Sequence, residues 1–155
     1  MKIRHSLFVA LVASAVSLAS STVSAVAAET PFKGTLTAVE TSQFVFPIAS
    51  VNREGTGTAT YLGKYTEHAT LQINVLTMSS TGASTFTAAN GDTLSASVVG
   101  HATKIGPTVL SIVEVYTITG GTGRFAGALG TLTLESTVEE TTGVSTGRFS
   151  GAIDH

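Results

Sequence analysis

Apolar and polar side chains alternate with a period of two along several stretches of this chain. Such alternation is typical of β-strands that have one buried and one exposed face. Between residues 93 and 103 the apolar face carries Leu94, Ala96, Val98 and Ala102. Between Val109 and Thr119 one face carries Leu110, Ile112, Glu114, Tyr116 and Ile118. A third stretch has Leu132, Leu134 and Val138 on its apolar face. Because no helical pattern follows residue 28, we predict an all-β fold.

Glycine-containing breaks separate these strands. The pair Asn90-Gly91 predicts a hairpin with a type I′ turn, in which both central residues need positive φ. Further breaks are expected at 106–107, 120–121 and 142–143. Earlier in the chain we expect a strand from Phe32 to Glu40, a loop from Pro47 to Gly55, and a long strand from Thr56 to Val75 interrupted at Gly63. The resulting seven or eight strands suit one closed barrel or a sandwich.

The first 28 residues have the layout of a secretory signal peptide. Lys2 and Arg4 precede an uncharged run from Leu7 to Leu18, and small residues follow as far as Ala28. The run, about 12 residues long, is too short to span a bilayer, and a polar tract at 17–24 argues against a retained anchor. We predict cleavage before Ala28 or Glu29, which leaves residues 29–155 as one β-barrel domain that is secreted or periplasmic.

Composition excludes several kinds of partner and site. The chain has no cysteine, which excludes disulfides and zinc–thiolate sites. Its net charge is -2, and removal of the leader leaves six basic against ten acidic residues. That balance gives no basic surface for nucleic acid. We therefore expect no cofactor, no metal, no nucleic acid and, after cleavage, no membrane as partner.

A short motif occurs twice, 24 residues apart, at Thr122–Leu129 and at Thr146–Ile153. Each copy has a glycine, an arginine and a phenylalanine in succession, and Gly63-Lys64-Tyr65 is a weaker third copy. We interpret the copies as barrel corners, where a glycine lets the strand bend around the aromatic ring. Arg124 and Arg148 then point outward; the alternative is that they bind an anionic group.

The segment Tyr116–Gly130 resembles the glycine-rich signature of bacterial exported proteins in the allene oxide cyclase and dirigent barrel superfamily. The other stretches that fit this group are Gly55–Gly57, Tyr61–Gly63, Ala88–Asp92 and Gly147–Ile153. The resemblance implies an eight-stranded antiparallel barrel whose apolar lumen holds small hydrophobic molecules or reactive intermediates. It also implies a homo-oligomer, since the plant relatives are often trimers. No motif matches the polar lumen groups of the plant members, so no catalytic residue is assigned.

One further motif match is excluded by the segment that follows it. Residues 121–126 satisfy the dinucleotide pattern G-x-G-x-x-A, but the segment that follows, 129–137, alternates with period two. It is therefore not the helix whose N-terminus would hold a pyrophosphate.

Five residues form the predicted ligand site. Glu114 and Tyr116 share a face with apolar residues, and burial of such a carboxylate would raise its pKa toward values useful in acid–base work. Tyr65 and Glu67 share a face with apolar residues of the long strand, and Tyr61 joins them if Gly63 does not shift the register. The alternatives are that Glu114 pairs with an arginine near a barrel end, or that it lies on the wet face.

Two functions fit these observations. The first is a barrel that binds a small apolar ligand in its lumen, with or without cyclase-like or isomerase-like chemistry. It requires a ligand-sized cavity reached by Glu114 and Tyr116. The second is a non-catalytic exported barrel that acts through its surface or by oligomerising.

Overall fold

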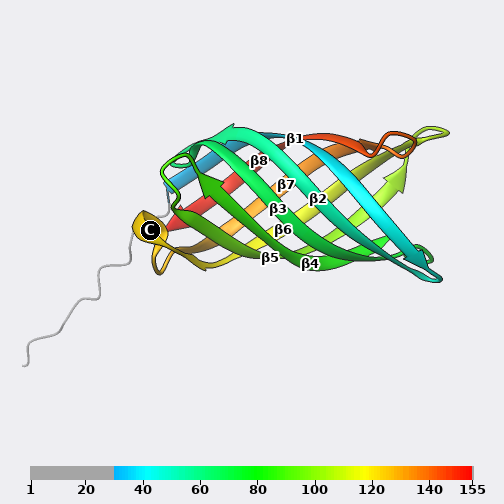
Figure 1. Cartoon of the computed structure of the whole chain (residues 1–155), viewed down its shortest axis with the longest axis horizontal. Helices are drawn as coiled ribbons and strands as arrows, with labels where there is room; N and C mark the ends of the chain where they lie inside the picture. The colour runs from blue at the N-terminus through cyan, green and yellow to red at the C-terminus, as the bar shows by residue number, and fades with distance from the viewer. Residues whose placement is uncertain (1–29, 155) are drawn as a thin grey trace, which may run out of the picture.

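Eight antiparallel strands follow one another along the chain and close into a barrel, in which β8 pairs with β1 (Figure 1). The strands are β1 (Thr30–Val45), β2 (Ile48–Ala59), β3 (Gly63–Asn74), β4 (Ser79–Ala88), β5 (Thr93–Lys104), β6 (Val109–Gly121), β7 (Leu129–Glu139) and β8 (Val144–Asp154). The computed structural model describes residues 30–154, so the predicted signal peptide, 1–28, lies outside them. The prediction of one all-β barrel is confirmed.

The period-two pattern places apolar side chains inside the barrel. Every apolar face predicted for residues 93–103, 109–119 and 131–139 points to the interior, and Thr and Ser cover much of the outside. An eight-stranded barrel has an interior just wide enough for side chains to fill. Residues 129–139 form a strand, which confirms that the glycine pattern at 121–126 does not precede a helix.

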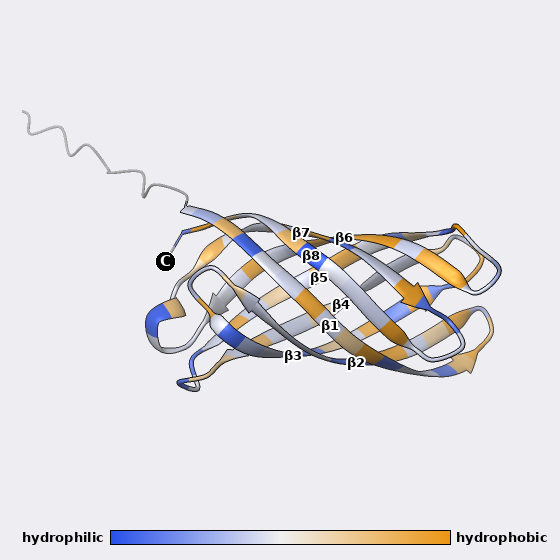
Figure 2. Ribbon diagram, turned by 90° about the horizontal axis from the view of Figure 1, so that it is seen from above, coloured by the Kyte–Doolittle hydropathy of each residue, from blue (hydrophilic) through white to orange (hydrophobic). Residues whose placement is uncertain are grey.

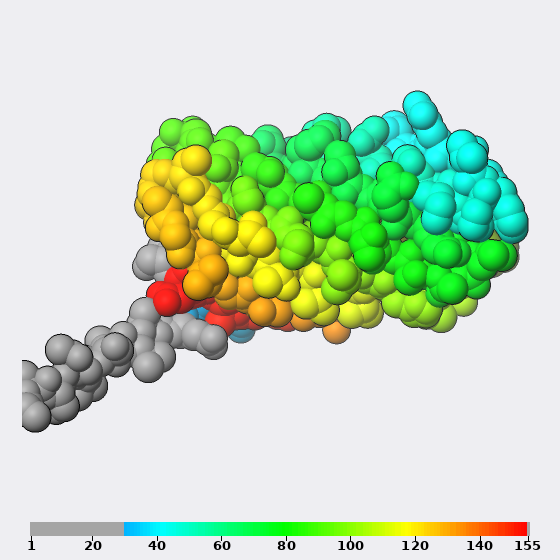
Figure 3. Space-filling model, turned by 90° about the horizontal axis from the view of Figure 1, so that it is seen from below, coloured from blue at the N-terminus to red at the C-terminus, as the bar shows by residue number. Residues whose placement is uncertain are grey.

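The two ends of the barrel differ. At the end where β1 begins and β8 finishes, the three-residue 3₁₀ turn η1 (Gly123–Phe125) places Phe125 in the buried core, and the yellow-orange atoms of this region gather at that end in Figure 3. This closed end is packed with large buried side chains, among them Phe32, Leu62, Phe86, Phe125 and Phe149. In residues 30–154 no helix is long and apolar enough to cross a membrane. The opposite end, formed by the β1–β2, β3–β4, β5–β6 and β7–β8 hairpins, has a smaller buried cluster of Ala102, Ile112 and Val138, against which Met78 and Leu110 pack.

The structure corrects the predicted course of the early strands. The loop predicted from Pro47 to Gly55 is most of β2, and Gly63 does not interrupt a strand but begins β3 after a turn. Residues 52–56 contain no apolar side chain that would mark a strand in the sequence. Arg53 nevertheless points into the barrel, where carboxylates from other strands compensate its charge.

Two local predictions also change. The β4–β5 hairpin forms at Asn90-Gly91, but only Gly91 has positive φ, at 88°, so the turn is not type I′. The first copy of the repeat does not bend a strand, as the corner interpretation expects, but contains the turn η1, whereas the second copy lies within β8. Gly123 has a φ of 55°, a conformation that favours glycine and lets the chain turn there.

Candidate functional site

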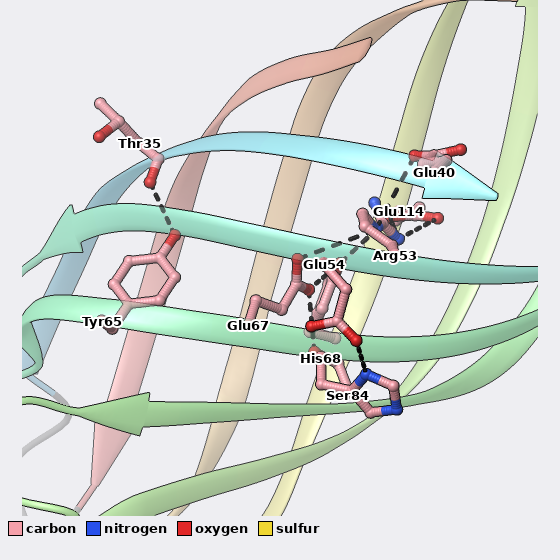
Figure 4. Close-up of polar contacts among 10 residues, drawn as sticks. Thr35, Glu40, Arg53, Glu54, Tyr65, Glu67, His68, Ser84 and Glu114 are labelled. Atoms are coloured by element: carbon pink, nitrogen blue, oxygen red, sulfur yellow. Dashed lines mark hydrogen bonds and ion pairs between the residues drawn. The ribbon is translucent and has the colours of Figure 1, made fainter. Parts of the chain in front are cut away.

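An arginine lies at the centre of the barrel, with no exposed surface. Arg53, on β2, donates hydrogen bonds from both terminal nitrogens to Glu114 on β6, with Nη1–Oε2 and Nη2–Oε2 distances of 2.9 and 2.8 Å (Figure 4). A charged group of this kind is stable in a protein interior only if it is paired and hydrogen-bonded. The pair therefore anchors β2 to β6 across the lumen.

Two further carboxylates approach the same guanidinium. Its Nε lies 3.8 Å from Glu67 Oε2 and 3.9 Å from Glu40 Oε1, and neither Nε nor Glu67 Oε2 makes a hydrogen bond. Glu40 is the outermost member, with 13% of its side chain exposed, whereas Glu67 is sealed. We call Arg53, Glu40, Glu67 and Glu114 the central cluster.

Tyr116 connects two of these carboxylates. Its hydroxyl oxygen lies 3.1 Å from Glu67 Oε1 and 3.1 Å from Glu114 Oε2, and Ser84 also donates to Glu67 at 2.9 Å. Because a phenol has one proton, it can donate to only one carboxylate at a time. A proton on one of the carboxyl groups would supply the second hydrogen bond.

The charges of the central cluster do not balance. Three carboxylates surround one guanidinium, so full ionisation would bury a net negative charge. Burial raises the pKa of Glu40 and of Glu114, while the Arg53 guanidinium opposes that rise. Burial also raises the pKa of Tyr116 well above its ordinary value, and the Glu67 carboxylate adds to the effect, so Tyr116 acts as a neutral donor.

Small residues on neighbouring strands leave room for the cluster. A Cβ atom at Gly100 would lie 2.6 Å from Glu114 Cγ, and one at Gly55 would lie 3.2 Å from Glu67 Oε2. Both glycines face the interior, where an ordinary side chain would collide with the carboxylates or push them aside. The inward glycines thus make the space that the charged side chains occupy.

A cavity of about 520 Å³ opens at the hairpin end, above the central cluster. Its apolar wall consists of Ala49, Val51, Ile73, Val75, Met78, Ala102, Leu110, Ile112 and Val138. Its polar side consists of Glu40, Ser42, Glu140, Thr141, Thr142 and Gly143. We call this space the mouth cavity. Of the central cluster, Glu40 lines the mouth cavity. A void of about 20 Å³ beneath the mouth cavity is lined by Glu40, Ser80 and Glu114 among others.

The structure brings three of the five predicted site residues together. Glu114, Tyr116 and Glu67 are joined by hydrogen bonds, and they lie below the mouth cavity rather than in its lining. Tyr65 faces inward but donates to the Thr35 carbonyl oxygen at 2.7 Å, closer to the closed end. Tyr61 lies in the β2–β3 turn and packs on the closed-end core.

The position of Glu114 settles the alternatives for this residue. It does not lie on the wet face, and its arginine partner lies in the middle of the lumen. Neither that partner, Arg53, nor Glu40 is among the site residues predicted from the sequence. The available signal was the period-two spacing of Val51, Arg53 and Gly55, and of Leu36, Ala38 and Glu40, which puts each charged residue on a face of apolar or small residues.

The surface arginines take no part in this site. Arg124 and Arg148 are exposed, as predicted, and Arg124 lies 3.8 Å from Asp92. A broad depression of about 680 Å³ on the outside of β1, β6, β7 and β8 includes Arg148 but no residue of the central cluster. Within residues 30–154, no three acidic or histidine side chains are placed to hold a metal ion.

Comparisons with protein-family models, with curated proteins and with solved structures found no match to this chain.

Proposed function

We propose that this protein is an exported binding barrel that holds a small, largely apolar molecule in its mouth cavity. The observation that carries the proposal is the cavity itself. Its volume of about 520 Å³ lies within the range of small-molecule sites, about 300–1,000 Å³. Its wall is mostly apolar, and Glu40 is one of the few polar groups of the kind that such sites use for specificity.

The resemblance to allene oxide cyclase and dirigent barrels supports the same proposal, since an eight-stranded antiparallel barrel with a ligand in its lumen is what it implies. The position of the cavity suggests a different division of roles from the one expected from the sequence. Glu40 would contact the ligand, while Arg53 and Glu67 would act on the charge of Glu40 from below. Cyclase-like or isomerase-like chemistry would then have to use Glu40 as its acid or base.

The test combines native mass spectrometry with a cavity-filling variant. Native mass spectrometry of the protein reports a co-purifying small molecule and the oligomeric state together. Ala102→Leu places a larger side chain in the mouth cavity, and Thr103→Leu places the same side chain on the outer face of β5. We expect a neutral apolar dye such as Nile red to bind the wild type and Thr103→Leu, and to bind Ala102→Leu at least about tenfold more weakly. Equal dye binding by both variants would contradict the proposal.

The second candidate, action through the surface or by oligomerising, is favoured by the hairpins around the mouth. Their tips expose large apolar side chains, namely Phe44, Val45, Phe46, Leu76 and Ile105. In Figure 2 several parts of the ribbon at this end of the barrel have the orange of hydrophobic residues. If these tips formed a subunit contact, native mass spectrometry would show an oligomer, and Phe44→Ser together with Phe46→Ser would dissociate it. The same double variant would leave dye binding in the mouth cavity unchanged.

A further inference from the structure

We propose that the mouth cavity selects an organic cation: an amphipathic amine whose ammonium group binds Glu40 and whose apolar part packs against the cavity wall. This inference rests on the proposed binding function and specifies the chemical class of the ligand. It follows from which charges line the cavity, which lie beneath it and how each is already paired.

The lining of the mouth cavity has acidic groups and no basic one. Glu40 and Glu140 are its charged members, and hydroxyl groups of serine and threonine complete its polar side. Lys104 pairs with Glu140 at the rim, with an Nζ–Oε2 distance of 2.6 Å, and does not itself line the cavity. Glu40 is therefore the charged group left to meet a ligand within the cavity.

The one cation beneath the cavity is already engaged by other carboxylates. Arg53 makes three hydrogen-bond contacts of 2.8 to 3.1 Å with Glu114, whereas its nearest approach to Glu40 is 3.9 Å. Glu40 thus has the longest ion-pair distance in the central cluster and the most exposed carboxyl group. An ammonium group entering from the mouth would complete its pairing and reduce the net negative charge of the cluster.

Other ligand classes fit this environment less well. A carboxylate or phosphate would face Glu40 and, behind it, Glu67 and Glu114, and like charges at short range repel each other. A purely apolar molecule would take water away from the Glu40 carboxyl group and would add no partner beyond the Ser145 hydroxyl and Arg53, which approaches only to 3.9 Å. That loss of water costs binding free energy. An ammonium group on an apolar chain suits both parts of the cavity. The ammonium group can donate charge-assisted hydrogen bonds to Glu40, which are stronger than neutral ones, and the apolar chain can pack against the cavity wall.

The experiment compares three probes with the same apolar chain: octylamine, octanol and octanoate. Their affinities are measured by isothermal titration calorimetry at fixed ionic strength and neutral pH. We expect octylamine to bind at least about tenfold more tightly than octanol. A tenfold ratio of affinities corresponds to about 1.4 kcal/mol, which is close to the lower end of what a hydrogen bond to a charged group contributes. Octanoate is expected to bind more weakly than octanol.

Two isosteric variants locate the effect. Glu40→Gln should remove the preference for octylamine and leave the affinity for octanol within about twofold. Glu140→Gln is the matched control, because it removes a carboxylate from the same cavity that Lys104 already neutralises; its preference should stay close to that of the wild type. If Glu40→Gln does not fold, the ranking of the three probes on the wild type still decides the question.

The outcomes separate the two proposals. Equal affinity for octylamine and octanol, or a preference that survives in Glu40→Gln, would overturn the cation assignment while leaving the mouth cavity a binding site. Failure of all three probes to bind, with Nile red binding unaffected by Ala102→Leu, would overturn the binding function and the cation assignment together.

Discussion

Replacing Arg53 by Met tests whether the guanidinium holds the barrel interior together. The substitution keeps a long apolar side chain but removes the guanidinium charge, from which three carboxylates lie 2.8, 3.8 and 3.9 Å away. Removing one partner of a buried ion pair costs about 3–5 kcal/mol, because the other charge stays buried without compensation. That is a large part of the roughly 5–15 kcal/mol by which a domain is usually stable.

An exposed ion pair of similar length provides the control. Lys104 and Glu140 approach to 2.6 Å, but 54% and 40% of their side chains are exposed, against 0% and 2% for Arg53 and Glu114. Solvent screens such pairs, so Lys104→Met should cost less than about 1 kcal/mol. Burial of the ion pair, and not the distance between its atoms, would then account for the difference in unfolding free energy between the two variants.

The assay is urea unfolding followed by far-UV circular dichroism, at neutral and mildly acidic pH. The loss of unfolding free energy caused by Arg53→Met should become smaller at acidic pH, because protonation of the three carboxylates removes their uncompensated negative charge. Each pKa unit by which a carboxyl group differs between the folded and unfolded states corresponds to about 1.4 kcal/mol. Adding Glu114→Gln to Arg53→Met should restore part of the loss, and keeps the test possible if the single variant does not fold. A loss no larger than that of Lys104→Met, or one that does not depend on pH, would refute the reasoning.

Three further predictions concern the same interior. Burial raises the pKa of Glu40 and Glu114, so the folded state retains protons that the unfolded chain releases. The free energy of unfolding should therefore fall as pH rises from a glutamate's ordinary pKa through these raised values, and Glu40→Gln should make that fall smaller; a rise over this range would contradict the assignment. Tyr116→Phe, which removes a hydroxyl lying 3.1 Å from two buried carboxylates, should cost about 1–3 kcal/mol in urea unfolding, and no loss would show that the hydroxyl is dispensable. Gly100→Ala should lower the free energy of unfolding by about 1–3 kcal/mol, because its Cβ would lie 2.6 Å from Glu114 Cγ. Gly106→Ala is the control, since its Cβ would have no neighbour nearer than 3.5 Å, and it should change the stability little. Equal effects of the two variants would argue against a crowded interior.

Much of the fold could be predicted from residues that obey the period of a strand. Leu94, Ala96 and Val98 define the inner face of β5, and the same pattern defines that of β6 and β7. The prediction failed in β2, where Arg53 occupies an inward position that the pattern assigns to an apolar residue. A charge inside a barrel depends on partners from distant strands, and no local pattern contains them.

The candidate site, too, could be predicted from the sequence only in part. The sequence indicated that Glu67, Glu114 and Tyr116 share faces with apolar residues, because side-chain direction in a strand depends only on whether the position is odd or even. Their meeting could not be predicted, since Glu67 and Tyr116 are 49 residues apart and their contact requires closure of the barrel.

By itself, then, the sequence determined an all-β chain with defined inner and outer faces, because that information is local and repeats every two residues. Only the tertiary structure decided which carboxylates share Arg53, that Glu40 is the one left facing the mouth cavity, and that the other end is closed by η1. These features depend on distances across the lumen, which are fixed by strand register and by the closure of β8 onto β1.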